Sequence, residues 1–447
     1  MASEAWAFGA GVLWFCLQVS FPLLPMPQSP FRSASAQRLA DAPPSALPDY
    51  DLVIVGGGIT GLTLACALQD SGLRIVVVEA QTQTAAIARQ QVYAVSLLSS
   101  RIFQGIGVWD QILPKIATFR QIRLSDGEHP GVVRFSPRDL GTGALGHVAE
   151  HRVLLQALQE HLAQCPRVQW LCPASVTQIQ YQAQEAELTL EVEGEVRSLR
   201  TRLVIAADGA RSRLRQWAGI STKGWQYWQS CITCDVKPAD PHSDTAYERF
   251  WPGGPFAILP LPEGRCRIVW TEPRAGAEAL MALDEQAFLG ELRRRYGDQM
   301  GPLALAGPRF MFPVQLMHSD RYVQTRLALV GDAAHCCHPV GGQGLNMGIR
   351  DAAALAQVLQ AAHQSGEDIG SLGVLKRYER WRRWENWLIL GFTDILDRLF
   401  SNAWLPLVVL RRLGLWLLRT LPPVKGLALR LMTGLLGRSP HLARPRP

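Results

Sequence analysis

The chain has 447 residues, of which 48% are hydrophobic and 19% charged, and its formal net charge is +7. This length allows two or three hydrophobic cores, and the composition fits a globular enzyme with additional hydrophobic segments. Eight basic residues and no acidic residue fall in 401–447, so residues 1–400 carry a net charge of −1. Because the positive charge is confined to the tail, nucleic-acid binding is excluded as a general function. Nine cysteines without a framework spacing favour a reducing compartment.

Residues 1–25 form a hydrophobic N-terminal segment that is uncharged from residue 5 onward. The uncharged run has about the length needed to cross a bilayer, although two prolines shorten its helical part. Arg32 and Arg38 follow it, and by the positive-inside rule they would leave the enzyme on the cytoplasmic side of a membrane. A peripheral anchor, or a translated stretch upstream of a true start at Met26, remain alternatives. Residues 26–48 are rich in proline, serine and alanine and are interpreted as a linker.

The most informative segment, residues 51–79, predicts a strand, a glycine turn, a helix and a second strand. Residues 52–55 are an unbroken apolar run, which is typical of a parallel strand buried on both faces. The glycines that follow have the spacing G-x-G-x-x-G, which suits a tight turn, close approach to a pyrophosphate and packing of helix on strand. The unit predicts dinucleotide binding by Gly56, Gly58 and Gly61, with Glu79 accepting hydrogen bonds from a ribose.

Two later segments favour FAD over NAD as the dinucleotide. A strand at 203–206 leads into Asp208-Gly209 and a basic segment, and a strand from 327 ends in Gly331-Asp332. A glycine-rich turn and a helical pattern at 346–357 come next. A carboxylate beside a helix N-terminus can hold a polyol, and a glycine-rich turn can offer N–H groups to an electron-rich ring edge. These properties suit the ribitol and isoalloxazine of a flavin.

These motifs together carry a resemblance to a known family. The G-x-G-x-x-G unit, the Asp208-Gly209 pair and the segment GDAAHCCHPVGGQGLN at 331–346 resemble the FAD-dependent aromatic hydroxylases of the para-hydroxybenzoate hydroxylase superfamily, ubiquinone-biosynthesis hydroxylase branch. The similarity extends from about residue 49 to 386. Its further supporting segments are YAVSLLSSRIFQGIGVWDQI, LGHVAEHRVL, AYERFWPGGPFAILPL and NMGIRDA.

The resemblance implies a set of cofactor-binding residues and leaves the catalytic residues unassigned. Arg152 matches the family arginine that approaches the flavin, and Asp208-Gly209 matches the motif linked to the FAD pyrophosphate and to NAD(P)H use. Asp332 would hold the ribitol, and residues 342–346 would line the flavin. The predicted set is Gly56, Gly58, Gly61, Glu79, Arg152, Asp208, Gly209, Asp332, Gly342, Gly344, Leu345 and Asn346. One position departs from the family pattern, because Gln91 stands where an arginine is usual, with Arg89 nearby.

The expected fold class is α/β: a Rossmann-like FAD-binding domain with an inserted antiparallel β-sheet substrate domain and C-terminal helices. We expect the FAD-binding domain at 49–219 and 308–375. Residues 220–307 alternate like strands and are expected to form the sheet that covers the substrate. Residues 376–447 are expected to be helical and membrane-associating, and a helical cap with solvated basic residues is the alternative.

Three residue clusters suggest chemistry that their context disfavours. His335-Cys336-Cys337-His338 is too compact for one metal ion and lies in the flavin motif, so no metal site is predicted. Cys231 and Cys234 lie in a strand pattern and are interpreted as buried core thiols rather than a redox pair. Three tryptophans recur at helical spacing, and they are interpreted as packing residues or as residues at a membrane interface: Trp381, Trp384 and Trp387.

The resemblance implies a monooxygenase that uses FAD, NAD(P)H and O2 to hydroxylate the aromatic ring of a prenylated quinone precursor at a membrane surface. Because the flavin carries the difficult chemistry, no catalytic triad is expected. One alternative is a flavoprotein that reduces or epoxidises a terpenoid lipid. Another is a non-catalytic flavin-binding partner of a quinone-synthesis complex.

Overall fold

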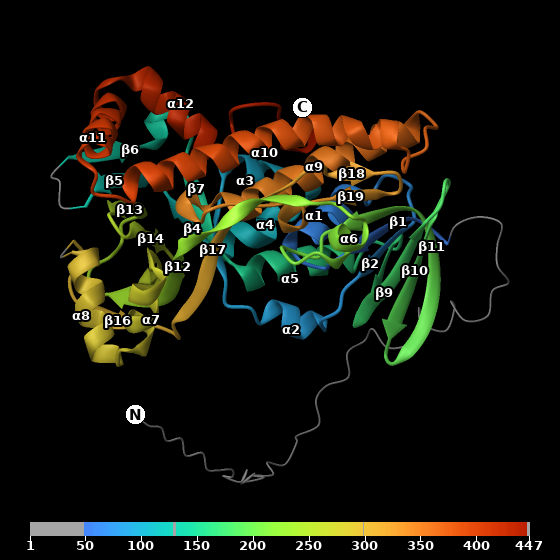
Figure 1. Cartoon of the computed structure of the whole chain (residues 1–447), viewed down its shortest axis with the longest axis horizontal. Helices are drawn as coiled ribbons and strands as arrows, with labels where there is room; N and C mark the ends of the chain where they lie inside the picture. The colour runs from blue at the N-terminus through green and yellow to red at the C-terminus, as the bar shows by residue number, and fades with distance from the viewer. Residues whose placement is uncertain (1–48, 128–130, 298, 445–447) are drawn as a thin grey trace, which may run out of the picture. The chain divides into compact units, whose positions relative to one another are not determined.

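A computed structural model describes residues 49–127, 131–297 and 299–444 of the chain. The predicted hydrophobic segment and linker at 1–48 lie outside the described residues. The α/β fold class is confirmed, with two large sheets, a small three-stranded sheet and helices packed around them (Figure 1).

The first large sheet carries the predicted Rossmann-like unit. Its central strands run in the order β18-β19-β11-β1-β2-β8, and β1 pairs in parallel with both β2 and β11. Strands β9 and β10 extend it as an antiparallel arm on β11. The strands are β1 (Tyr50–Val55), β2 (Ile75–Val78), β8 (Val168–Leu171), β9 (Ala174–Tyr181), β10 (Ala186–Val192), β11 (Glu195–Ala206), β18 (Val323–Gln324) and β19 (Leu327–Leu329).

Helices cover this sheet because its central strands are apolar on both faces. All four residues of β2 are buried, and α1 packs against α5 and α9. The helices on this side of the molecule are α1 (Ile59–Ala67), α2 (Gln83–Ile87), α3 (Leu97–Ile106), α4 (Trp109–Ile112), α5 (His151–Leu162), α6 (Arg213–Trp217) and α9 (Gln343–Gln364). Helix α9 begins three residues before the helix predicted at 346–357 and ends seven residues after it.

The second large sheet is mainly antiparallel, as expected for the substrate domain, and has the order β20-β17-β12-β15-β14-β13-β5-β6, with β16 on β12. It is wider than the predicted segment 220–307. Strand β5 joins it by parallel pairing with β13, which no local pattern signals. The strands are β5 (Gln121–Asp126), β6 (Val132–Phe135), β12 (Thr222–Pro238), β13 (Thr245–Trp251), β14 (Gly254–Pro260), β15 (Cys266–Pro273), β16 (Leu303–Leu305), β17 (Phe310–Ser319) and β20 (His335–Cys336).

Helices α7 (Arg274–Ala282) and α8 (Glu285–Tyr296) lie at one side of this sheet, and α11 (Leu405–Thr420) and α12 (Pro422–Met432) lie at the other (Figure 1). The core on the α8 side includes Phe256, Trp270 and Phe288. Cys231 and Cys234 are buried in β12, which confirms their interpretation as core thiols. The small third sheet consists of β3 (Val92–Val95), β4 (Ala117–Phe119) and β7 (Gly146–Glu150).

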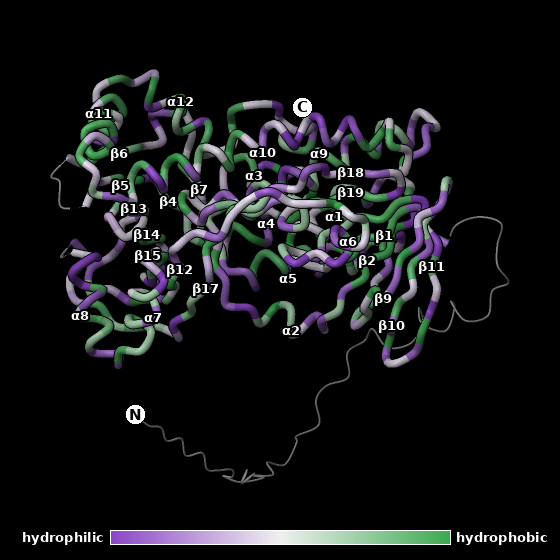
Figure 2. The backbone as a smooth tube through the Cα atoms, in the orientation of Figure 1, coloured by the Kyte–Doolittle hydropathy of each residue, from purple (hydrophilic) through white to green (hydrophobic). Residues whose placement is uncertain are grey.

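The C-terminal region is helical, as predicted, and consists of α10 (Leu372–Phe400), α11 (Leu405–Thr420) and α12 (Pro422–Met432). Helix α10 runs alongside α9, and α11 packs on β6 (Figure 1). Figure 2 shows hydrophobic residues predominating along α11. Among the described residues, no helix combines the length and the apolar character needed to cross a bilayer.

Candidate active site

A cavity of about 280 Å³ lies at the carboxyl ends of the parallel strands. It is lined by the turns that follow β1, β2 and β11, among them Gly58, Glu79 and Asp208. The sheet order changes direction at β1, because β2 lies on one side of it and β11 on the other. Open α/β sheets bind ligands at such a switch point, so this is where a dinucleotide is expected.

The glycine turn has the geometry that its spacing predicts. Gly56 has a φ of +114°, and a Cβ there would lie 2.3 Å from the carbonyl oxygen of Ala207. A Cβ on Gly61 would lie 2.0 Å from the carbonyl oxygen of Gly56. Gly58 is different, because a Cβ there would meet no atom within 4 Å. The first and third glycines therefore allow close packing, while Gly58 leaves space at the N-terminus of α1.

Two carboxylates border this cavity. Glu79 accepts hydrogen bonds from the backbone N–H of Gly57 at 2.6 Å and of Gln81 at 2.8 Å, which fixes it at the end of β2. Asp208 accepts from the N–H of Leu214 through one oxygen, while its other oxygen is buried without a hydrogen-bond partner. Burial raises the pKa of Asp208. An unpaired acceptor in a glycine-lined cavity fits a ligand that brings hydroxyl or N–H donors.

A second cavity, of about 750 Å³, lies between the flavin motif, the substrate sheet and the C-terminal helices. Asp332 and residues 341–346 form one part of its wall. Arg89 lines both this cavity and the smaller one, so the two spaces meet at this side chain. A ligand with a dinucleotide at one end and a reactive ring at the other matches this arrangement.

Asp332 follows β19 and faces the large cavity. Its carboxylate is exposed to the cavity and makes no hydrogen bond or ion pair within the residues that the structure describes. Desolvation by the surrounding protein raises its pKa, His335 lowers it and the nearby Asp351 raises it. A carboxylate without a partner at this position fits the polyol that the sequence predicts.

Asn346 is predicted to line the flavin, and it borders the cavity, but its side chain is already fully used. Its Nδ2 donates to the carbonyls of Ala94 and Gly342, both at 2.7 Å. Its Oδ1 accepts from the N–H of Ser96 at 2.9 Å and from the Ser99 hydroxyl at 2.7 Å. Asn346 therefore joins the glycine-rich loop to the β3–α3 segment. Gly342, Gly344 and Leu345 also line this cavity.

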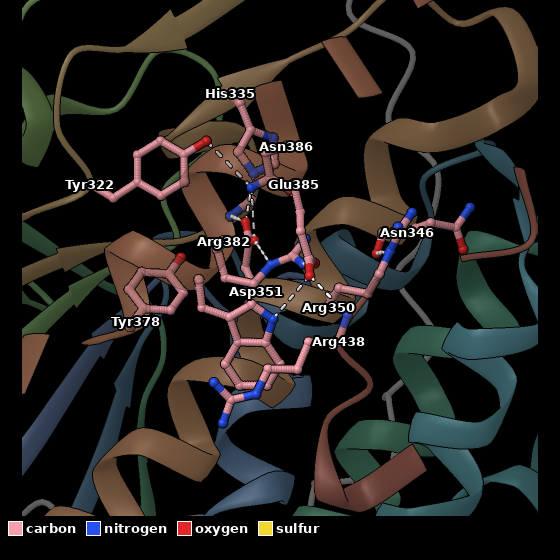
Figure 3. Close-up of polar contacts among 12 residues, drawn as sticks. Tyr322, His335, Asn346, Arg350, Asp351, Tyr378, Arg382, Glu385, Asn386 and Arg438 are labelled. Atoms are coloured by element: carbon pink, nitrogen blue, oxygen red, sulfur yellow. Dashed lines mark hydrogen bonds and ion pairs between the residues drawn. The ribbon is translucent and has the colours of Figure 1, made fainter. Parts of the chain in front are cut away.

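A buried polar network around Asp351 lies behind the segment that carries Asp332, and Figure 3 shows its side chains. Asp351 of α9 accepts from Arg382 at 2.8 Å, from the Asn386 amide at 3.0 Å and from the N–H of Gly331 at 3.2 Å, and it contacts His335 at 2.6 Å. Hydrogen bonds and electrostatic attraction from His335 and Arg382 hold the pKa of Asp351 well below its usual range despite burial. The network fixes the residue next to Asp332 and ties the flavin motif to α10.

Arg152 does not line either cavity. Its side chain is 64% exposed and pairs with Glu150 at 2.7 Å, because the first turn of α5 directs it outward. Arg89 borders both cavities and donates to the Gln81 side chain at 2.7 Å. Gln91, at the position of the usual family arginine, accepts from the Tyr93 hydroxyl at 2.9 Å. Arg89, and not Arg152, is therefore the arginine that borders both cavities.

The His335–His338 segment is divided between two environments. His335 contacts Asp351, and His338 contacts Gln229 at 3.3 Å. Cys336 and Cys337 line the large cavity. Within the described part of the chain, no group of three potential metal ligands converges.

Sequence reasoning missed two features of the large cavity. Glu248 on β13 lines it, and the only signal was the alternation of Ala246, Glu248 and Phe250 on one face of the strand. Helices α10, α11 and α12 supply a continuous apolar wall that no motif indicates. Its residues are Phe392, Leu396, Leu418, Ala428, Leu429 and Met432.

Comparison with known proteins decides the family. Residues 49–393 match the model of the FAD binding domain family. The chain belongs to this family. It is 40% identical over 397 residues to the ubiquinone hydroxylase UbiL of Rhodospirillum rubrum, covering 88% of this chain and 92% of that protein. It is 56% identical over 394 residues to an uncharacterized protein of Synechocystis, covering 88% and 95% respectively.

The protein is thus an FAD-dependent monooxygenase of the aromatic hydroxylase type, in the ubiquinone-biosynthesis branch. The solved structure of p-nitrophenol 4-monooxygenase from Pseudomonas putida superposes with a TM-score of 0.74 at 21% identity, covering 87% of this chain and 98% of that one. This likeness confirms the fold, with its Rossmann-like FAD domain and substrate domain.

The residues of the two cavities fit FAD. The glycine turn, the N-terminus of α1 and Asp208 would hold the phosphates, and Glu79 would hold the ribose. Asp332 and the loop 341–346 would hold the ribitol and the ring system. When bound, the flavin supplies the redox chemistry that activates O2. The chain itself would supply a largely apolar cavity that positions the substrate and limits the access of water.

Proposed function

We propose that this hydroxylase adds one oxygen atom from O2 to the aromatic ring of a prenylated quinone precursor, with NAD(P)H as the reductant. The observation that carries the proposal is the large cavity of about 750 Å³, which joins the flavin motif to the apolar wall of α10–α12. A phenolic head at the flavin end and an isoprenoid tail along that wall match its two ends. UbiL, which is named a ubiquinone hydroxylase, supports this substrate class.

The wall chemistry favours a tail without polar groups. Leu396 of α10, Leu418 of α11 and Leu429 of α12 face the cavity, and the helices contribute no charged side chain to its lining. Burying an isoprenoid against such a surface stabilises the complex by roughly 25 cal/mol per Å² of apolar area. This contribution grows with the length of the tail until the wall ends.

Substrate-stimulated consumption of NAD(P)H tests this proposal against a non-catalytic partner role. We expect the FAD-loaded protein to oxidise NAD(P)H slowly alone and much faster with a short-chain prenylated phenol. Mass spectrometry should then show one added oxygen on the ring. Bound FAD without any stimulation or product would instead support a flavin-binding partner.

We further propose that the protein works at a membrane surface, bound peripherally through α10–α12. The inner faces of these helices line the cavity, and their outer faces carry large apolar side chains that are exposed. A bilayer at this surface would bring the lipid substrate next to the helices that form the wall of its binding cavity. The exposed residues include Trp384, Trp387, Ile395, Trp404, Leu405, Val409, Leu410, Leu413 and Trp416.

The basic residues of the tail contribute less to this surface than their number suggests. Arg411 is buried and pairs with Asp126 at 2.9 Å, so it cannot reach lipid headgroups. Lys425 pairs with Asp139 at 2.9 Å. These acidic partners come from distant segments, so the absence of acidic residues within the tail did not predict that its basic residues would be free. Membrane binding is therefore expected to depend on apolar side chains more than on charge.

Vesicle co-sedimentation tests the membrane proposal. A chain that begins at Met26 should pellet with anionic vesicles, and the triple substitution Val409→Ser, Leu413→Ser and Trp416→Ser should weaken binding at least about tenfold, because each apolar side chain contributes on the order of 1.5–3 kcal/mol when buried. Val196→Ser is the matched control, since Val196 is 76% exposed on β11. Equal binding by the triple variant and the control would contradict the proposal.

A further inference from the structure

One carboxyl group in the substrate cavity is not explained by any sequence motif. Glu248 lies on β13 and lines the large cavity, and its carboxyl makes no hydrogen bond or ion pair within the described residues. Unpaired carboxyls inside proteins are costly and cluster at functional sites.

The strand register places Glu248 within a row that crosses the whole cavity-facing side of the sheet. It pairs with Leu124 of β5 on one side and with Ala257 of β14 on the other. The row continues from Ala257 through Val269 to Thr233 and Phe310, all of which line the cavity. Glu248 is the only ionisable side chain in this row, and the small Ala257 beside it leaves room for a ligand.

The charged groups around the cavity leave Glu248 without a protein counter-ion. Arg267 of β15 pairs with Asp235 at 2.5 Å and also donates to the carbonyl of Gln90. Arg89 donates to Gln81 on the opposite wall. The helices α10–α12 add no charged side chain. The other ionisable groups near Glu248 or lining the cavity are Tyr93, Cys231, Tyr247, Asp332, Cys336 and Cys337.

We propose that the carboxylate of Glu248 accepts a hydrogen bond from the ring hydroxyl of the phenolic substrate and takes up its proton during hydroxylation. This inference rests on the proposed function. The hydroxyl proton moves to a carboxylate oxygen as ring electrons shift toward the carbon that gains one oxygen atom of O2. The other oxygen atom leaves as water, with the two electrons that NAD(P)H supplies. The carbon then loses its own hydrogen as a proton to solvent, and Glu248 returns its proton to the ring oxygen as the ring regains aromaticity. Glu248 therefore ends the reaction unchanged.

The protonation behaviour of Glu248 supports this role. Burial raises its pKa to about 8, with no charged neighbour among the causes. General acid–base groups work best when they titrate near the working pH. A carboxyl that exchanges its proton near neutrality can both receive the phenol proton and return it.

Ligand binding at two pH values tests the proposal on the FAD-loaded, full-length protein. A group with a pKa near 8 is ionised in about one tenth of molecules at pH 7 and nine tenths at pH 9. The apparent affinity for a short-chain prenylated phenol should therefore rise about tenfold between these values. The corresponding methyl ether, which has no proton to donate, should show no rise.

Glu248→Gln keeps an acceptor of similar shape but removes the titration, so its phenol affinity should change less than about twofold over the same range. Glu248→Leu should bind the phenol weakly at both values. Glu191→Gln, an exposed change on β10 outside both cavities, should behave as the unmodified protein.

The outcomes separate the two proposals. Persistence of the tenfold rise in Glu248→Gln overturns the role of Glu248, as does unchanged phenol binding by Glu248→Leu. Failure of the unmodified protein to bind or hydroxylate any prenylated phenol overturns the proposed function itself.

Discussion

Replacing Gly58 by valine should abolish FAD binding while leaving the protein folded. Gly58 has an extended backbone with a φ of −75°, which any residue adopts, and a Cβ there meets no protein atom within 4 Å. The side chain would instead enter the space in front of the α1 N-terminus, where the pyrophosphate is expected. Loss of even one or two charge-assisted hydrogen bonds of about 1.5–3 kcal/mol each weakens binding at least tenfold. Flavin absorbance after purification and thermal unfolding measure both properties.

Two other glycines provide the controls for this prediction. Gly290→Val also places its Cβ in open space, on α8 and away from both cavities, and should retain FAD. Gly61→Val should misfold, since its Cβ would lie 2.0 Å from the carbonyl oxygen of Gly56. If Gly58→Val bound FAD with unchanged affinity, the turn would not be the phosphate site.

Replacing Asp332 by alanine should also cost most of the bound flavin. The carboxylate faces the large cavity without a protein partner, so its hydrogen bonds are available to the ribitol. Each charged hydrogen bond contributes about 1.5–3 kcal/mol, which corresponds to a ten- to hundredfold weaker complex. Asp332→Asn retains one acceptor and should lose less. Full FAD occupancy in the alanine variant would contradict the assignment.

The parts of the site that the sequence predicted are those built from local structure. Gly56, Gly58, Gly61 and Glu79 lie within one strand–helix–strand unit, so spacing alone determined their geometry. Asp332 followed the same rule, because it leaves the end of a buried strand and its carboxylate has space in front of it.

The parts that the sequence did not predict depend on contacts between distant segments. Arg152 was expected near the flavin, yet the first turn of α5 directs it to solvent. The amide of Asn346 is used by residues some 250 positions earlier, which no pattern around it reveals. Arg411 belongs to the basic tail, but it pairs with Asp126 at the end of β5, a segment far away in the sequence.

The substrate cavity shows the same limitation on a larger scale. Its walls come from β5, β13, the flavin loop and the C-terminal helices, which are far apart in the chain. Period-two alternation could have marked Glu248 as an inward-facing carboxyl, but only the register of β13 with β5 and β14 shows that its neighbours are apolar.

The central claim, that this hydroxylase transfers oxygen from O2 to an aromatic ring, is tested most directly by isotope labelling. The FAD-loaded protein would be supplied with NAD(P)H, labelled O2 and a short-chain prenylated phenol, and the product would be fragmented in a mass spectrometer. We predict one labelled oxygen atom on the ring fragment and none on the prenyl fragment. Label on the prenyl chain, a reduced chain without label, or ring oxygen derived from water would contradict the claim.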